Sequence, residues 1–160
     1  MNMLKNDEYY MKSALRSAKT AAKHGEVPIG CVIVRGGEII ARGYNTRESK
    51  SNALHHVEIT AIDRACRKTG AWRLQDCTLY VTLEPCPMCA GAIVNARIKR
   101  VVYGCKDSKA GAYGSVFDLR EYPLNHKYAV EGGVLEKECA GVLSGFFKEL
   151  RKKQKESAET

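Results

Sequence analysis

Apolar residues of this chain recur in two patterns, at helical spacing and in short continuous runs. The helical spacing predicts helices over residues 7–23, 56–68, 87–96 and from 136 onward. The apolar runs predict strands over residues 29–34, 38–42, 77–83, 99–105 and 128–130. The run 77–83 is apolar at nearly every position, which is typical of a strand that is buried on both faces.

Strands that alternate with helices predict the fold class. We expect an α/β fold, a three-layer α/β/α sandwich with a mixed, mostly five-stranded central sheet. A length of 160 residues favours one domain, predicted over residues 1–155, and residues 156–160 are expected to be a disordered tail. The polar segment 44–54 and the glycine-containing segment 106–115 are predicted to be loops.

The composition narrows the class of protein. No apolar run approaches the ~18 residues of a membrane span, and the first seven residues lack the apolar core of a secretory signal. We therefore expect a cytoplasmic protein with no membrane contact. Seven cysteines are spread along the chain and are not clustered as in a disulfide scaffold. The net charge of +8 suits a polyanionic partner such as nucleic acid, although the basic C-terminal residues also fit a solvated helix end.

Two short motifs carry the candidate chemistry. His56 and Glu58 flank a single residue, and Cys86 and Cys89 flank a Pro-Met pair at the start of the next predicted helix. Pro87 suits the first helical position, so both thiols lie on one side of a helix N-terminus. With His56 they supply three soft ligands, which leaves one position open on a zinc ion, as in catalytic sites. Glu58 is then free to move protons for a zinc-activated water.

Other interpretations of the two cysteines stay open. Cys86 and Cys89 alone also fit a redox pair or half of a structural zinc site. A structural site needs a fourth protein ligand, and no second paired spacing of cysteine or histidine supplies one. His55 is the neighbour of His56, but only His56 has the His-x-Glu spacing with Glu58. Because residues i and i+2 do not share a helix face, His56 must lie at the very start of its helix.

These motifs resemble the H-x-E and P-C-x-x-C signature of the zinc-dependent cytidine and deoxycytidylate deaminases. The resemblance is strongest to the family of bacterial tRNA-specific adenosine deaminases and covers nearly the whole chain. It includes the first-strand entry 26–30, the turn 43–45, the metal strand and helix 78–92 and the glycine-containing segment 104–115. It implies that the predicted sandwich is cytidine deaminase-like.

The resemblance implies an enzyme that deaminates adenosine to inosine at the wobble position of a tRNA anticodon. One zinc ion per subunit would be bound by His56, Cys86 and Cys89, with Glu58 as the proton shuttle. The resemblance also implies a homodimer, with a tRNA anticodon stem-loop as its partner. The implied substrate contacts are an amide that bonds the base, three residues that line its pocket and an acid beside the ribose: Asn45, Val27, Leu83, Pro85 and Asp107.

Two other functions share these features. A deaminase of a free base or nucleotide, such as guanine or deoxycytidylate, would have the same zinc site. A zinc-stabilised RNA-binding module would have the metal without turnover. The chain departs from the family pattern at Val57, which is commonly Ala, at Tyr44, which is often Trp, and in residues 48–55, which lack the usual Asp-Pro. These departures concern the shape of the pocket more than its chemistry.

Overall fold

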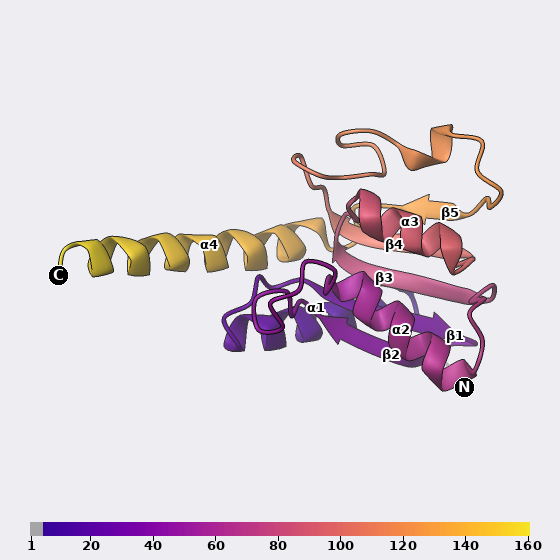
Figure 1. The fold of residues 1–160 in the computed structure, drawn as a ribbon, viewed down its shortest axis with the longest axis horizontal. Helices are drawn as coiled ribbons and strands as arrows, with labels where there is room; N and C mark the ends of the chain where they lie inside the picture. Colours follow the sequence, from indigo (N-terminus) through magenta and orange to yellow (C-terminus); the bar gives the residue numbers. More distant parts are fainter. Residues whose placement is uncertain (1–4) are drawn as a thin grey trace.

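The computed structural model describes residues 5–160, and its elements follow the order that the apolar pattern predicts (Figure 1). The helices are α1 (Asp7–Lys23), α2 (Val57–Thr69), α3 (Pro87–Asn95) and α4 (Glu136–Ala158), with a 3-10 turn, η1, at Leu119–Glu121. The strands are β1 (Gly30–Arg35), β2 (Glu38–Tyr44), β3 (Cys77–Leu83), β4 (Arg100–Cys105) and β5 (Ala129–Glu131). The start of the predicted domain, residues 1–4, lies outside the described residues.

The strands form one mixed sheet in the order β2-β1-β3-β4-β5. β1 runs antiparallel to both β2 and β3, whereas β3, β4 and β5 run parallel to one another. α3 connects β3 to β4, as a parallel pair requires a crossover. The predicted α/β fold with a mixed five-stranded sheet is confirmed.

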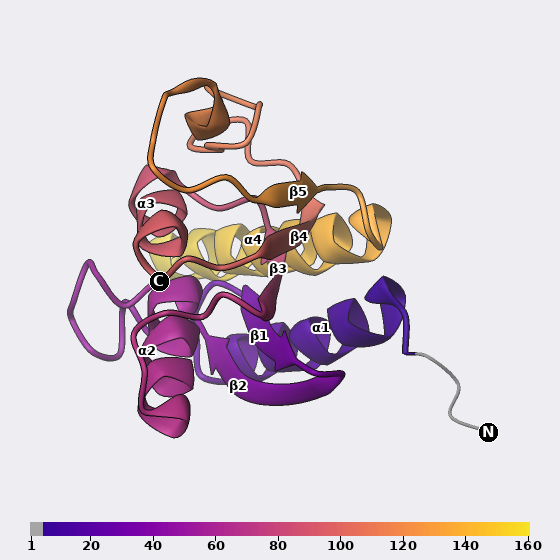
Figure 2. The same cartoon turned by 90° about the vertical axis from the view of Figure 1, so that its right-hand side faces the viewer.

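Helices cover both faces of the sheet (Figure 2). α2 and α3 pack on one face, and α1 and α4 pack on the other. Alternate residues of β1 show how the two cores form: Cys31 and Ile33 belong to the core beneath α2 and α3, and Val32 and Val34 to the core beneath α1 and α4. Both sides of the strand are apolar because both are covered.

A polar cluster joins the N-terminus of α1 to the strands β3, β4 and β5. The Arg100 guanidinium donates to both carboxylate oxygens of Asp7, at 2.8 and 2.7 Å, and also pairs with Glu131. The Tyr80 hydroxyl donates to Asp7 at 2.8 Å. The Arg100 guanidinium holds the pKa of Asp7 below its usual value. Arg100 is the first residue of β4, so these contacts lie at the opposite end of this strand from Cys105.

α4 begins on the sheet and then leaves the body of the protein (Figure 1). Cys139 is buried near its start, whereas residues 148–160 are exposed. The helix continues to Ala158, so most of the segment 156–160 is helical where the sequence predicts a disordered tail. Lys, Glu and Gln are good helix formers, and no Gly or Pro interrupts them after position 145. Among the helices of residues 5–160, none combines the length and the apolar character that crossing a membrane requires.

α1 lies close to the sheet because Gly30 has no side chain. A Cβ at Gly30 would collide with the carbonyl oxygen of Ala14 and lie 2.5 Å from the nitrogen of Ala18. Both opposing atoms are backbone, so neither can move without shifting the helix. Gly141 in α4 is the opposite case, since a Cβ there would meet nothing within 4 Å.

We therefore expect Gly30→Ala to lower the free energy of unfolding by about 2 kcal/mol or more, because overpacking forces α1 away from β1. Gly141→Ala is the matched control and should raise it by up to about 1 kcal/mol, through helix propensity. Urea unfolding followed by circular dichroism measures both. Equal stabilities for the two variants would contradict the close packing.

Candidate metal centre and substrate pocket

The first candidate motif lies at the N-terminus of α2. His56 is the N-cap residue, with an extended backbone (φ −69°, ψ 154°), and Glu58 follows in the first turn. His56 therefore lies at the very start of its helix, as the His-x-Glu spacing predicts. The extended N-cap lets the His56 side chain leave the helix axis, while Glu58 turns back toward the same space and is only 5% exposed.

The second motif lies at the N-terminus of α3, directly after β3. Cys86 is the N-cap, Pro87 occupies the first turn and Cys89 is fully buried. The imidazole Nδ1 of His56 lies 3.5 Å from Sγ of Cys86 and 3.6 Å from Sγ of Cys89. The ligand atoms of all three residues lie within 4.8 Å of one another. Two helix N-termini therefore bring one imidazole and two thiols to a single point.

These distances fit a tetrahedral zinc ion. Zn–N bonds of about 2.1 Å and Zn–S bonds of about 2.3 Å at the tetrahedral angle require an N···S separation of about 3.6 Å. The structure has 3.5 and 3.6 Å between the corresponding atoms. The donor set of two sulfurs and one imidazole nitrogen is also one that favours zinc. The residues present therefore fit the metal that the sequence predicts.

The thiols are prepared for ligation by their contacts with one another and with His56. The Cys89 thiol next to Cys86 lowers the pKa of Cys86 to about 4, with His56 contributing in the same direction against the effect of burial. The same sulfur contact and burial raise the pKa of Cys89. The pKa of His56 is raised, chiefly by its contact with Cys86. These contacts favour the thiolate form of Cys86, which is the form that binds a metal.

Glu58 has the protonation behaviour of a proton carrier. Burial raises the pKa of its carboxyl from 4.5 to about 7, and the nearby Cys86 sulfur acts in the same direction. A group whose pKa lies near neutrality exchanges protons in both directions at low cost. Perturbed carboxyls of this kind are frequent at catalytic sites.

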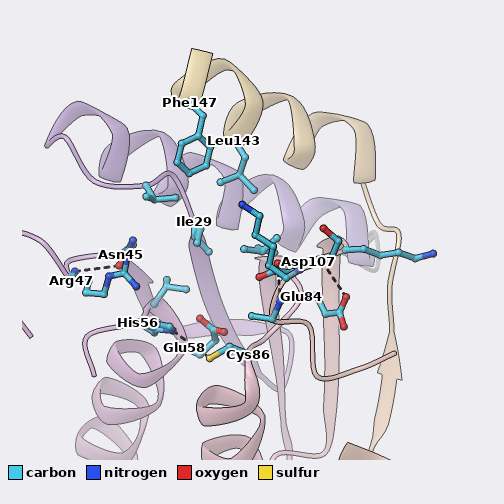
Figure 3. Close-up of a pocket in the computed structure, with 17 residues that line it drawn as sticks. Ile29, Asn45, Arg47, His56, Glu58, Glu84, Cys86, Asp107, Leu143 and Phe147 are labelled. Carbon is cyan, nitrogen blue, oxygen red and sulfur yellow. Dashed lines mark hydrogen bonds between the residues drawn. The ribbon is translucent and has the colours of Figure 1, made fainter. Parts of the chain in front are cut away.

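A cavity of about 530 Å³ opens above these residues (Figure 3). It lies at one edge of the sheet, because the carboxyl ends of β2, β3 and β4 and the amino end of β1 meet there. Most of the sequence-predicted site residues line it: Val27, Asn45, His56, Glu58, Leu83, Cys86 and Asp107. Pro85 and Cys89 are not among the lining residues. Cys89 is buried beneath the cavity, and the Pro85 carbonyl accepts from the amide of Ala112 at 2.9 Å.

Two loops form opposite walls of this cavity. The first pocket loop is residues 45–56, between β2 and α2, and the second pocket loop is residues 106–115, after β4. In the first, Oδ1 of Asn45 accepts from the amide of Arg47 at 3.2 Å, which leaves its side-chain NH₂ for a ligand. In the second, Oδ1 of Asp107 accepts from the amides of Lys109 and Ala110, which leaves Oδ2 for a ligand.

Several lining residues are not among those predicted from the sequence. They include one cation of the first pocket loop, one acid before Cys86 and two apolar residues of α4: Arg47, Glu84, Leu143 and Phe147. A glutamate at the end of a doubly buried strand was a usable signal for Glu84, since such a position is otherwise apolar. Helical spacing marks both α4 residues as apolar helix positions, and this spacing does not single out the residues of a cavity. Only the path of α4 across the sheet brings them to the cavity (Figure 3).

Comparison with known proteins agrees with this geometry. A family model described as MafB19-like deaminase matches residues 5–151. The "tRNA-specific adenosine deaminase" of Bacillus subtilis (strain 168) is 55% identical over 150 residues, which is 93% of each chain. A solved structure from work on A-to-I editing by tRNA:A34 deaminases at the wobble position of transfer RNA has a TM-score of 0.82 and 43% identity, covering 84% of this chain and 99% of that one. Guanine deaminase from Bacillus subtilis has a TM-score of 0.63 and 41% identity, covering 71% of this chain and 72% of that one.

The sandwich fold, the His/Cys/Cys cluster and the buried glutamate define a deaminase-type site. The chain belongs to the deaminase family whose members include the tRNA-specific adenosine deaminases. The family resemblance drawn from the sequence motifs is thereby confirmed.

The raised pKa of Glu58 predicts a pH dependence of stability in the metal-free protein. A carboxyl whose folded pKa is about 7 binds its proton more tightly in the folded state, so its stabilising contribution is complete below 4.5 and is lost as pH rises through 7. Glu58→Gln removes this loss. We expect the free energy of unfolding of the variant, relative to that of the wild type, to rise by about 3 kcal/mol between pH 4.5 and pH 8, at 1.36 kcal/mol per pKa unit.

Urea unfolding in the presence of a chelator, at several pH values in this range, measures the difference. Glu131→Gln is the control, because Glu131 is largely exposed and far from the cavity. A difference between Glu58→Gln and wild type that does not change with pH would contradict the buried, protonated state of Glu58.

Proposed function

We propose that this protein hydrolytically deaminates adenosine to inosine at the wobble position of a tRNA anticodon. The observation that carries the proposal is the buried Glu58 beside the His56, Cys86 and Cys89 cluster, at the floor of a cavity of about 530 Å³. The B. subtilis relative is named for this activity and matches over almost the whole chain. The solved structure with a TM-score of 0.82 comes from studies of the same reaction.

His56, Cys86 and Cys89 would hold one zinc ion per subunit. When bound, zinc supplies the Lewis acidity that makes hydroxide available near neutral pH. The reaction consumes one water, replaces the amino group at C6 of adenine by a carbonyl oxygen and releases ammonia. Glu58 takes one proton from the water and delivers it to the ring nitrogen, then takes the remaining proton from the new hydroxyl on C6 and delivers it to the departing amine. Its pKa of about 7 suits both directions of transfer.

The remaining predicted residues would orient the base. Val27 and Leu83 provide apolar walls, and the free NH₂ of Asn45 donates to an acceptor atom of the purine. Pro85 stands behind this wall and fixes the second pocket loop through its carbonyl. Oδ1 of Asp107 accepts from its own loop, and Oδ2 would accept from a ribose hydroxyl, a group that distinguishes RNA from DNA.

Charge around the cavity supports an RNA substrate. Arg47 on the first pocket loop and Lys106 and Lys109 on the second line the cavity from opposite sides. Cations placed this way would contact the phosphates that flank an everted base. An anticodon base is already in a single-stranded loop, so turning it into the cavity costs little pairing energy.

The homodimer and the cytoplasmic location stay predictions from the resemblance. Light scattering on the purified zinc-loaded protein measures the mass directly, and a chain of 17.7 kDa should give twice that value as a dimer. The assignment of residues 1–155 to a single deaminase domain is likewise part of this proposal.

A direct substrate comparison tests the function. Zinc-loaded protein is incubated with an anticodon stem-loop that carries adenosine at the wobble position, and in parallel with free guanine and free nucleotides. We expect inosine at that position of the RNA and no ammonia from the small molecules. Guanine is the specific alternative, because the B. subtilis guanine deaminase is 41% identical over the shared region. Turnover of guanine alone would replace the tRNA assignment.

Glu58→Gln tests the proton carrier in the same assay. Loss of a positioned acid–base group should slow inosine formation by about 10²–10⁴-fold. Zinc content, measured by atomic absorption, should stay at the wild-type value because Glu58 is not one of the three clustered ligand residues. A variant with wild-type turnover would remove Glu58 from the mechanism. A variant with no zinc would show that Glu58 contributes to the metal site itself.

A further inference from the structure

Buried glutamates occupy three positions in the described residues: Glu26, Glu58 and Glu84. The reaction accounts for Glu58 but not for the other two, which are 1% and 2% exposed. Neither Glu26 nor Glu84 forms an ion pair with Lys or Arg anywhere in residues 5–160. A buried carboxylate without a cation is costly unless hydrogen-bond donors surround it. The hydrogen-bond donors around each carboxylate therefore identify the segment that it stabilises.

Every donor to Glu84 comes from the second pocket loop. Oε1 accepts from the amide of Asp107 at 3.2 Å and from the hydroxyl of Ser115. Oε2 accepts from the amides of Tyr113 at 2.9 Å and Ser115 at 3.3 Å. Gly111 completes the enclosure, because a Cβ at this position would collide with the carboxylate. One side chain thus receives donors from both ends of the loop that contains Asp107. Figure 3 shows Glu84 beside Asp107.

Glu26 has the same relation to the first pocket loop. Its Oε2 accepts from the amide of Glu48 at 3.2 Å, and its Oε1 accepts from the amide of Ser49. Burial raises the pKa of Glu26, but donation from Ser49 and Glu48 outweighs burial and leaves the pKa below its usual value. The loop that contains Asn45 and Arg47 is therefore also bound to a buried carboxylate.

We propose that Glu26 and Glu84 are positioning residues, each of which holds one pocket loop in the conformation that binds RNA. The RNA-binding part of this proposal rests on the proposed function, whereas the loop-holding part does not.

The chain connections of the two glutamates explain why they suit this role. Glu84 is two residues from Cys86, so the second pocket loop is held in register with the metal centre. Glu26 is next to Val27, so the first pocket loop is held in register with the wall of the base pocket. Other amides of the two loops donate to carbonyls in turns, whereas those of Glu48, Ser49, Tyr113 and Ser115 donate to the two carboxylates. A carboxylate accepts several amides at once, whereas a glutamine would direct its NH₂ toward donors.

Hydrogen exchange on the zinc-loaded protein tests the loop-holding part, with each variant as the control for the other. Glu84→Gln should speed exchange of the Tyr113 and Ser115 amides by about tenfold or more and leave those of Glu48 and Ser49 unchanged. Glu26→Gln should give the reverse pattern. Exchange that rises equally in both loops for either variant, or in neither, would overturn the proposal.

Kinetics on the anticodon stem-loop test the RNA-binding part. Each variant should raise KM by about tenfold or more and keep kcat within about threefold, because a loosened loop weakens binding before it alters the chemistry. Zinc content should stay at the wild-type value. Asp7→Asn is the matched control: it breaks the polar cluster at the start of α1 and lowers the melting temperature, but it should leave KM unchanged.

The outcomes separate the possible failures. Asp7→Asn could raise KM as much as the glutamate variants do, at the same loss of melting temperature. This result would show that both glutamates act only through overall stability, and it would overturn the proposal. If Glu84→Gln does not fold, Ser115→Ala removes the hydroxyl donor and one of the four hydrogen bonds, and should give a smaller rise in KM and faster exchange at Tyr113. A wild type inactive on the stem-loop would refute the proposed function and the RNA-binding part, while the exchange pattern still decides the loop-holding part.

Discussion

The site depends on the meeting of two helix N-termini at one edge of the sheet. β3 leads directly into α3, whose N-cap is Cys86, while the loop after β2 leads into α2, whose N-cap is His56. N-cap residues have extended backbones, so their side chains leave the helix axis and can converge. The N···S separations of 3.5 and 3.6 Å are those of a tetrahedral metal site. Without this convergence the same residues would be an ordinary histidine, a half-buried thiol at Cys86 and a buried thiol at Cys89.

The three acids of the site differ in their burial and in their hydrogen-bond partners. Glu58 is buried beside the sulfurs, and its pKa rises to about 7, where it can carry protons. Glu84 is equally buried but is surrounded by amide and hydroxyl donors of the second pocket loop. Asp107 remains at the surface of the cavity, with one oxygen bound to its own loop and the other free. The surroundings of each carboxylate, and not the type of side chain, distinguish the three acids, and the different roles proposed for them rest on that difference.

The amount that could be predicted differs from residue to residue for physical reasons. The position of His56 at the start of its helix followed from the His-x-Glu spacing, because i and i+2 share no helix face. Asn45 and Asp107 came only from the family resemblance, since isolated polar loop residues have no distinctive spacing. Glu26 also carries no local signal, because its donors, Glu48 and Ser49, lie on a loop beyond the following hairpin. The segment 156–160 was predicted to be a disordered tail from its place in the sequence, but its helix-forming residues continue α4 to Ala158.

The sequence by itself determined the elements, the mixed α/β class and the set of candidate metal ligands, because periodicity and ligand spacing are local properties of a chain. Tertiary structure alone decided which side chains share the cavity, since that depends on strand order and on the path of α4. Leu143 and Phe147 reach the cavity only because α4 crosses the sheet face above β4. The pKa of Glu58 likewise depends on burial between two helices and a sheet, which no stretch of sequence contains by itself.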